Sequence, residues 1–111
     1  MKTWMIAAAV LFAVPFSARA DKVERTWKAK CATCHGASGD GKTDEAAKHG
    51  GVPDYTSAKW QASVKDPELT DAITNGVKTK DGKDNRMEGF GDKLDKDQIA
   101  GLVKYIRTLA K

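Results

Sequence analysis

The chain has 111 residues, which predicts a single domain. It carries 19 Lys and Arg residues against 15 Asp and Glu residues, and it has only two cysteines, Cys31 and Cys34. A disulfide between these two would close a very small loop and would constrain little of the unfolded chain, which excludes a disulfide framework. A domain of this size often needs a metal or a large cofactor to complete its core.

Residues 1–20 have the pattern of a secretory signal peptide. Lys2 gives a positive start, residues 4–16 are mostly apolar, and Ala18-Arg19-Ala20 supplies a small-x-small cleavage pattern. The apolar run is too short to span a bilayer comfortably, and no stop-transfer flank follows it. We therefore favour a leader cleaved after Ala20 over an uncleaved membrane anchor. Residues 21–111 are then the mature domain, expected in the periplasm without stable membrane insertion.

The net charge changes when the leader is removed. Lys2 and Arg19 leave with it, so 19 basic and 15 acidic residues become 17 and 15, and the formal charge falls from +4 to +2. The sequence pI of about 9.1 therefore belongs largely to the precursor. We expect no nucleic-acid partner for a mature domain with so small a charge.

A helix is predicted from Asp21 to about Cys34, with Asp21 as its N-cap and Glu24 completing a capping box. Gly36 is placed to end it. Its apolar face is predicted to carry Val23, Trp27, Cys31 and Cys34.

Shorter helical patterns occupy the middle of the chain. One turn is predicted within residues 44–49 and a short helix over residues 56–64. A clearer helix starts with Asp66 as the cap and Pro67 at the first helical position, and Gly76 is placed to end it.

No strand pattern is evident. Residues 78–86 are polar, charged and rich in turn formers, which predicts a surface loop. Their acidic residues do not match the spacing of a calcium-binding loop.

The last helix has the strongest signals, with Asp95 as the cap, Gln98 at the third helical position, and Leu94 and Ile99 as a hydrophobic staple. Its apolar stripe is predicted to be Ile99, Leu102, Val103, Ile106 and Leu109. The mature domain is therefore predicted to be all-α.

The segment Cys31-Ala32-Thr33-Cys34-His35 is a C-x-x-C-H haem attachment pattern. Positions i, i+3 and i+4 of a helix face the same way, so two thiols can bond to one haem while His35 reaches its iron. A zinc site would need four ligands, and His49 is the only other cysteine or histidine. A thioredoxin-like pair would need a βαβ setting, for which there is no pattern.

Met87 is the only methionine left once the leader is removed. A lone methionine is ordinarily a core residue, but Met87 stands between Arg86 and Glu88, which is a poor position for one. We therefore interpret Met87 as the second axial ligand of the iron. His49, in a glycine-rich loop, is the rival ligand, although an exposed histidine is the simpler interpretation.

With these residues in place, the mature chain resembles the class I c-type cytochromes over its whole length, and small bacterial single-haem members most closely around residues 86–94. The resemblance implies first and last helices that cross around one covalently bound haem c. It implies thioether bonds from Cys31 and Cys34, and iron ligation by His35 and Met87. Further residues that match the family are Trp27, Leu102 and Tyr105, which pack at the helix crossing in its members.

Two positions depart from the family pattern. Glu88 stands where many relatives have proline after the ligand methionine, so we expect a less rigid loop. Val23 stands where relatives often place glycine for close helix contact, so we expect a wider crossing. The resemblance also suggests the Pro53 carbonyl as the group that holds His35.

Three functions remain open from the sequence. The first is a monomeric, non-enzymatic electron shuttle between a redox donor and acceptor, such as an oxidase, a reductase or a dehydrogenase. The second is a haem enzyme or gas sensor with an open sixth coordination position. The third is a dedicated subunit of a periplasmic oxidoreductase. Four lysines are candidates for a partner-binding rim at the haem edge: Lys28, Lys30, Lys42 and Lys83.

The leader pattern predicts a specific product. Removing 20 of the 111 residues leaves 91, so mass spectrometry of the exported protein should give a 91-residue chain that starts at Asp21 and carries one haem. A product that retains Met1, or one without the mass of a haem, would show this prediction to be wrong.

Overall fold

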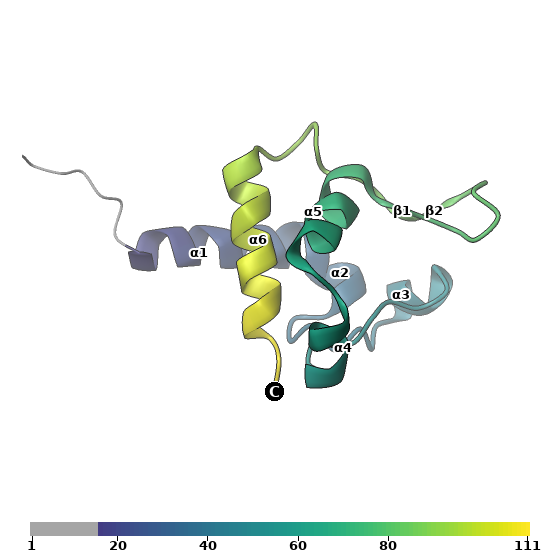
Figure 1. The fold of residues 1–111 in the computed structure, drawn as a ribbon, viewed down its shortest axis with the longest axis horizontal. Coiled ribbons are helices and arrows are strands. Elements are labelled where there is room, and N and C mark those ends of the chain that lie inside the picture. The colour runs from purple at the N-terminus through teal and green to yellow at the C-terminus, as the bar shows by residue number, and fades with distance from the viewer. Residues whose placement is uncertain (1–15) are drawn as a thin grey trace, which may run out of the picture.

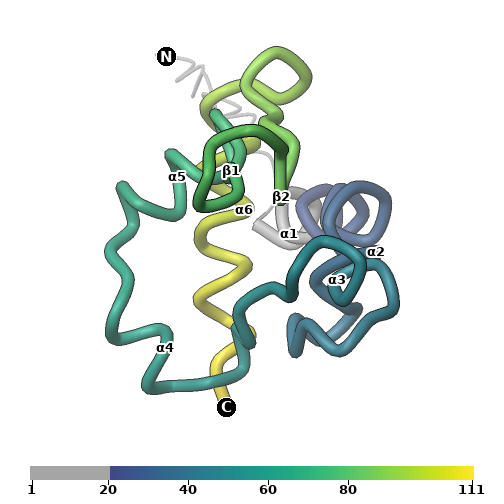
Figure 2. The backbone as a smooth tube through the Cα atoms, turned by 90° about the vertical axis from the view of Figure 1, so that its right-hand side faces the viewer, coloured from purple at the N-terminus to yellow at the C-terminus, as the bar shows by residue number. Residues whose placement is uncertain are grey.

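The computed structural model describes residues 16–111, so most of the predicted leader lies outside the described residues. Helices dominate this part of the chain, as predicted, and in the view of Figure 2 α6 lies between α4 and α5 on the left and α2 and α3 on the right. In chain order the elements are α1 (Phe16–Thr26), the π-helical turn η1 (Trp27–Cys31), α2 (Ala32–His35), α3 (Asp44–Lys48), α4 (Ala58–Ser63), α5 (Asp66–Asn75), β1 (Val77–Lys78), β2 (Asn85–Met87) and α6 (Lys96–Thr108).

The first helix differs from the prediction at its start. Asp21 lies inside α1, so it does not cap the helix, and the predicted capping box with Glu24 is wrong. The residues before Asp21 are already helical and leave no free first turn for its side chain to cap. Glu24 instead forms an ion pair with Lys28, one turn further on, at 3.3 Å.

A π-helical turn connects this helix to the cysteine motif. The amide of Ala32 donates to the carbonyl of Trp27, five residues earlier, and Cys31 has a φ of −113°. Such turns insert an extra residue and bend the helix, and they are frequent at functional sites. In Figure 1, α2 lies out of line with α1. The bend brings the ring of His35 to 5.8 Å from that of Trp27, measured between centroids.

The first and last helices cross, as the resemblance implies (Figure 1). Trp27 and Leu102 are each only 1% exposed, and the rings of Trp27 and Tyr105 are 5.3 Å apart. Trp27 also donates from its indole nitrogen to the carbonyl of Gly36 at 3.2 Å. Its polar group is therefore satisfied although the side chain is fully buried.

Gly101 makes the close approach of these helices possible. A Cβ at this position would meet Cγ2 of Val23 at 2.8 Å, which is closer than real Cβ atoms come to a neighbour. The small residue that the family often has on the first helix is therefore found here on the last one. Val23 fills the space that Gly101 leaves, so the departure at position 23 does not by itself separate the helices.

The start of α6 is as predicted. Asp95 accepts a hydrogen bond from the amide of Gln98 at 2.8 Å, and the Gln98 side chain accepts one from the amide of Asp95 at 2.9 Å. Both staple residues, Leu94 and Ile99, are buried. The predicted stripe forms the centre of the core, with Leu109 partly buried and the other four members fully so: Ile99, Leu102, Val103 and Ile106.

Helix α5 begins at Asp66, the residue that was predicted to be its N-cap, and therefore one residue earlier than expected. Lys65 is the N-cap, because the carboxylate of Asp66 is bound by Arg107 at 2.9 Å instead of by the first-turn amides. Arg107 also donates to the carbonyls of Gln61 and Val64. The Arg107 guanidinium, near the end of α6, therefore holds the connection between α4 and α5 in place.

Part of the predicted surface loop is a short hairpin. β1 and β2 are antiparallel, with Val77 opposite Met87 and Lys78 opposite Asn85. One step along β1 thus matches two steps along β2, which leaves Arg86 as the extra residue of a β-bulge. Strands of two and three residues are too short to show an alternating pattern, which is why the sequence did not reveal them.

The helix crossing generates a prediction about stability. Trp27→Ala removes a fully buried aromatic side chain and should lower the free energy of unfolding by about 3–5 kcal/mol. Denaturant titration followed by circular dichroism measures this. Lys104→Ala, on the exposed side of α6, is the matched control and should change stability by less than about 0.5 kcal/mol. Equal effects of the two variants would contradict the packing role of Trp27.

Candidate functional site

A cavity of about 480 Å³ lies between α2, the segment after α3, α4, α5 and the hairpin. Its volume is in the range of small-molecule and cofactor sites. His35 and Met87, 52 residues apart in the chain, both line it. Its remaining apolar wall consists of Val52, Pro53, Tyr55, Trp60, Val64, Leu69, Ala72 and Val77.

His35 lies on one wall and is only 6% exposed. The Tyr55 ring stacks on it, with centroids 4.9 Å apart and planes 16° from parallel. Burial lowers the pKa of His35 to about 4, so the imidazole is neutral near pH 7 and able to bind a metal. Its Nδ1 is a buried polar atom without a hydrogen-bond partner, which is costly unless something else engages the ring.

The Pro53 carbonyl does not hold His35 in this structure. Pro53 lines the cavity together with the histidine, as the resemblance suggested. However, Nδ1 of His35 finds no acceptor among the described residues, so the expected hydrogen bond is absent. Stacking against Tyr55 and packing against Trp27 orient the ring instead.

Cys31 and Cys34 are both half-buried, and neither is in a disulfide. Burial raises the pKa of the Cys31 thiol to about 11, although Lys30 acts in the opposite direction. Redox-active C-x-x-C pairs depend on a lowered pKa, because the thiolate is the reactive form. The environment of Cys31 therefore does not fit a thioredoxin-like pair.

Met87 lies on another wall, at the end of β2 and directly after the loop predicted over residues 78–86. It is half-buried and packs against the core. The backbone around it is set by Gly76, whose φ is +79°, a conformation that other residues rarely adopt. A Cβ at Gly76 would collide with the Met87 carbonyl and the Gly89 amide. The backbone after the end of α5 is thus in direct contact with the backbone of residues 87–89.

The segment after Met87 is also fixed to α5. The amide of Phe90 donates to the carbonyl of Ile73 at 2.8 Å, and that of Gly91 donates to Thr74 at 3.0 Å. Glu88, at the position where relatives have proline, is exposed and pairs with Lys93 at 2.9 Å. Backbone hydrogen bonds therefore restrain this segment without the proline.

The other residues that the sequence singled out lie outside the cavity lining. His49, the rival ligand, is exposed, and its Nε2 is 3.8 Å from the carboxylate of Glu45. The four candidate rim lysines are also exposed: Lys28, Lys30, Lys42 and Lys83.

Sequence reasoning missed three contributors to this region. Tyr55 had one available signal, an aromatic residue in a polar loop just after Pro53. Arg86 lies next to Met87, but its hydrogen bonds to residues 49–51 have no local signature. Gln61 donates to the carbonyls of Tyr55 and Ile106, and thus joins the site to α6.

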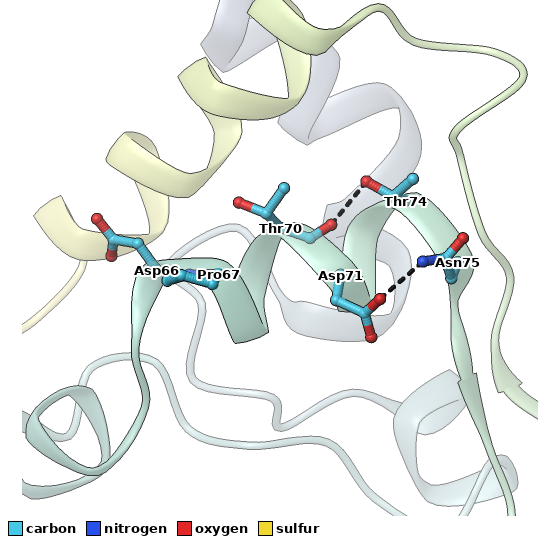
Figure 3. Close-up of a pocket in the computed structure, with 6 residues that line it drawn as sticks. All are labelled: Asp66, Pro67, Thr70, Asp71, Thr74 and Asn75. Carbon is cyan, nitrogen blue, oxygen red and sulfur yellow. Dashed lines mark hydrogen bonds between the residues drawn. The ribbon is translucent and has the colours of Figure 1, made fainter.

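A second hollow, of about 540 Å³, lies along the outer side of α5 (Figure 3). Its polar groups are largely engaged with one another, as in the bonds from Thr74 to the Thr70 carbonyl and from Asn75 to Asp71, both at 2.7 Å. Across the described chain, no group of three or more His, Cys, Asp and Glu side chains could hold a metal ion. None of the helices from residue 16 onward is long and apolar enough to cross a membrane.

Comparison with known proteins matches residues 18–106 to the family described as cytochrome c oxidase, cbb3-type, subunit III. The chain belongs to this family. Its cytochrome c fold is shown equally by a solved c-type cytochrome, KustC0563, with a TM-score of 0.67 and 28% identity over 79% of this chain and 96% of that one. A point mutant of the same protein gives a TM-score of 0.65 at 28% identity, over 78% and 96% of the two chains.

A curated relative of this cytochrome c domain is the cbb3-type cytochrome c oxidase subunit FixP of Azorhizobium caulinodans. The two are 33% identical over 82 residues, which cover 72% of this chain and 26% of the relative. The chain thus spans about a quarter of the length of that protein.

A c-type cytochrome domain implies haem c, and the cavity fits that group. Its wall is largely apolar apart from Glu68 and Arg86, and it is lined by a neutral imidazole and a thioether from different elements. Cys34 directly precedes the histidine and Cys31 lies four residues before it, although neither cysteine is among the residues that line the cavity. Imidazole, thioether and thiols are the donor set that c-type haems use.

The cavity walls come from separate short elements, which would be marginal alone, so haem attachment should stabilise the domain strongly. The variant Cys31→Ala with Cys34→Ala should lack covalent haem and be largely unfolded by far-ultraviolet circular dichroism. Thr33→Ala, an exposed position between the two cysteines, is the control and should keep both haem and helix content. Native-like helicity in the double variant would contradict the prediction.

Proposed function

We propose that this protein is an exported, single-haem electron carrier whose iron is ligated by His35 and Met87. The observation that supports it most is that the imidazole and the thioether, 52 residues apart, line one largely apolar cavity. With both axial positions filled by the protein, no position is left for a substrate. The protein would then act by electron transfer and not as an enzyme.

Each site residue has a defined task in this proposal. The thiols of Cys31 and Cys34 would hold the haem covalently, each through a thioether bond formed by addition of S–H across a vinyl group. When bound, haem c supplies a one-electron change of its iron. His35 would hold the iron from the wall that it shares with Tyr55, and Met87 would hold it from the hairpin.

The surroundings favour the reduced form of the site. A thioether is a soft, neutral ligand, and it raises the reduction potential relative to ligation by two histidines. The apolar part of the wall disfavours the additional positive charge of the ferric state, although the Glu68 carboxylate in the same lining acts in the opposite direction. The ring of His35 is held by stacking on Tyr55, so little movement of the protein is needed between oxidation states.

The relative suggests the setting and the partner. FixP is named as a subunit of a cbb3-type cytochrome c oxidase. We therefore propose a terminal oxidase as one redox partner. Cleavage of the leader after Ala20 would leave residues 21–111 as a periplasmic domain that acts as a shuttle or as a dedicated subunit.

Removal of the thioether tests the ligation. The wild-type ferric protein should show the weak far-red sulfur-to-iron band at neutral pH, and Met87→Ala should abolish this band and lower the reduction potential. Lys78→Ala, at an exposed hairpin position that does not line the cavity, is the control and should retain the band.

Two results would contradict this proposal. One is a wild-type ferric spectrum without the sulfur band. The other is ready binding of carbon monoxide by the ferrous wild type at neutral pH, which would indicate an open sixth position and favour a sensor or an enzyme.

A further inference from the structure

Arg86, the residue before Met87, joins the hairpin to the segment after α3. Its Nε donates to the carbonyl of His49 at 3.3 Å, and its Nη2 donates to the carbonyls of Gly50 at 3.3 Å and Gly51 at 2.5 Å. Three successive carbonyls therefore bind one cation. Hydrogen bonds of a charged donor are roughly twice as strong as neutral ones, and only a guanidinium has donors spread widely enough for all three.

The acceptor segment has a backbone that suits this contact. Gly50 and Gly51 have φ values of +84° and +87°, a conformation that strongly favours glycine. The amides of His49 and Gly51 both donate to the carbonyl of Ala46, at 3.1 and 2.7 Å. The turn is thus held in place while its own carbonyls remain free to accept from Arg86.

The β-bulge explains how Arg86 and Met87, which are adjacent in the sequence, can both line the cavity. Side chains that follow one another in a regular strand point to opposite faces. Arg86 is the extra residue opposite the step from Val77 to Lys78, and bulges redirect side chains in this way. Arg86 and Met87 consequently both line the cavity.

The segment that Arg86 binds is connected to the wall that carries His35. Thr43, the N-cap of α3, donates to the carbonyl of Cys34 at 2.6 Å and accepts from the amide of Ala46 at 3.0 Å. Beyond the turn, Gly51 and its two successors continue as cavity lining. A continuous series of contacts thus runs from the cysteine motif through α3 to Arg86.

We infer that Arg86 is a positioning residue for Met87: by binding the carbonyls of residues 49–51, it holds β2, and with it the thioether, at a fixed place relative to His35. This inference rests on the proposed ligation of the iron by His35 and Met87. It adds the Arg86 contact, before Met87, to the backbone hydrogen bonds of Phe90 and Gly91 that restrain the chain after it.

Competition with imidazole for the ferric iron tests this role in the haem-loaded protein. Arg86→Gln should bind imidazole at least about tenfold more tightly than the wild type, a factor that corresponds to about 1.4 kcal/mol. Arg86→Lys keeps the charge but cannot span three carbonyls, and should lie in between. Lys80→Gln removes an equal charge from the exposed tip of the hairpin and should leave the affinity unchanged.

A second variant, Gly51→Ala, alters the turn whose carbonyls accept the hydrogen bonds of Arg86. Gly51→Ala meets no atom within 4 Å of the new Cβ, but its φ of +87° disfavours alanine. It should also raise the imidazole affinity, and in combination with Arg86→Gln the two effects should not add, because both break one contact. If Arg86→Gln fails to fold or to take up haem, the imidazole affinity of Gly51→Ala tests the positioning role of Arg86 instead.

The outcomes separate the two proposals. Wild-type imidazole affinity in Arg86→Gln, or in Gly51→Ala where the arginine variant does not fold, overturns the positioning role. So does an Arg86→Gln effect no larger than that of Lys80→Gln. A wild-type protein without the sulfur band overturns the ligation by Met87 itself, and this is seen before any Arg86 variant is made.

Discussion

The packing of Trp27 is the interaction on which the rest of this domain depends. Its side chain is fully buried, and its ring lies within 6.1 Å of the rings of Tyr105, His35 and Tyr55, measured between centroids. The same indole donates to the carbonyl of Gly36, at the turn that ends the cysteine motif. A single residue therefore connects the helix crossing to the cavity that His35 lines, so a shift of the crossing would also move His35.

The two walls of the cavity have different physical origins. The histidine wall is local, because the motif, the π-helical turn and Trp27 lie within ten residues of one another. The methionine wall is formed by contacts between distant segments, including the backbone bonds from Phe90 to Ile73 and those of Arg86 to residues 49–51. The exposed pair of Glu88 and Lys93 adds little to this, since surface ion pairs contribute at most about 1 kcal/mol.

What could be predicted from sequence follows from this difference. The capping box of α6, its apolar stripe and the helix that carries the motif have strong local signals, and the structure confirms them. The meeting of Trp27 with Tyr105 came from family resemblance. The Asp21 cap was wrong because the helix continues through it, and the hairpin was too short to show an alternating pattern. Contacts such as those of Arg86 and Arg107 depend on which carbonyls the fold brings close, and no local pattern encodes that.

The contact between Gly101 and Val23 has a consequence for how such domains vary. Close approach of the two helices requires a small residue at the crossing, but either helix can provide it. Natural selection would therefore act on the combined volume of the two positions, and compensating exchanges between them would be nearly neutral. The absence of glycine at position 23 therefore indicates a wider crossing only if position 101 is also occupied by a larger residue. Positions 23 and 101 should accordingly covary among related sequences.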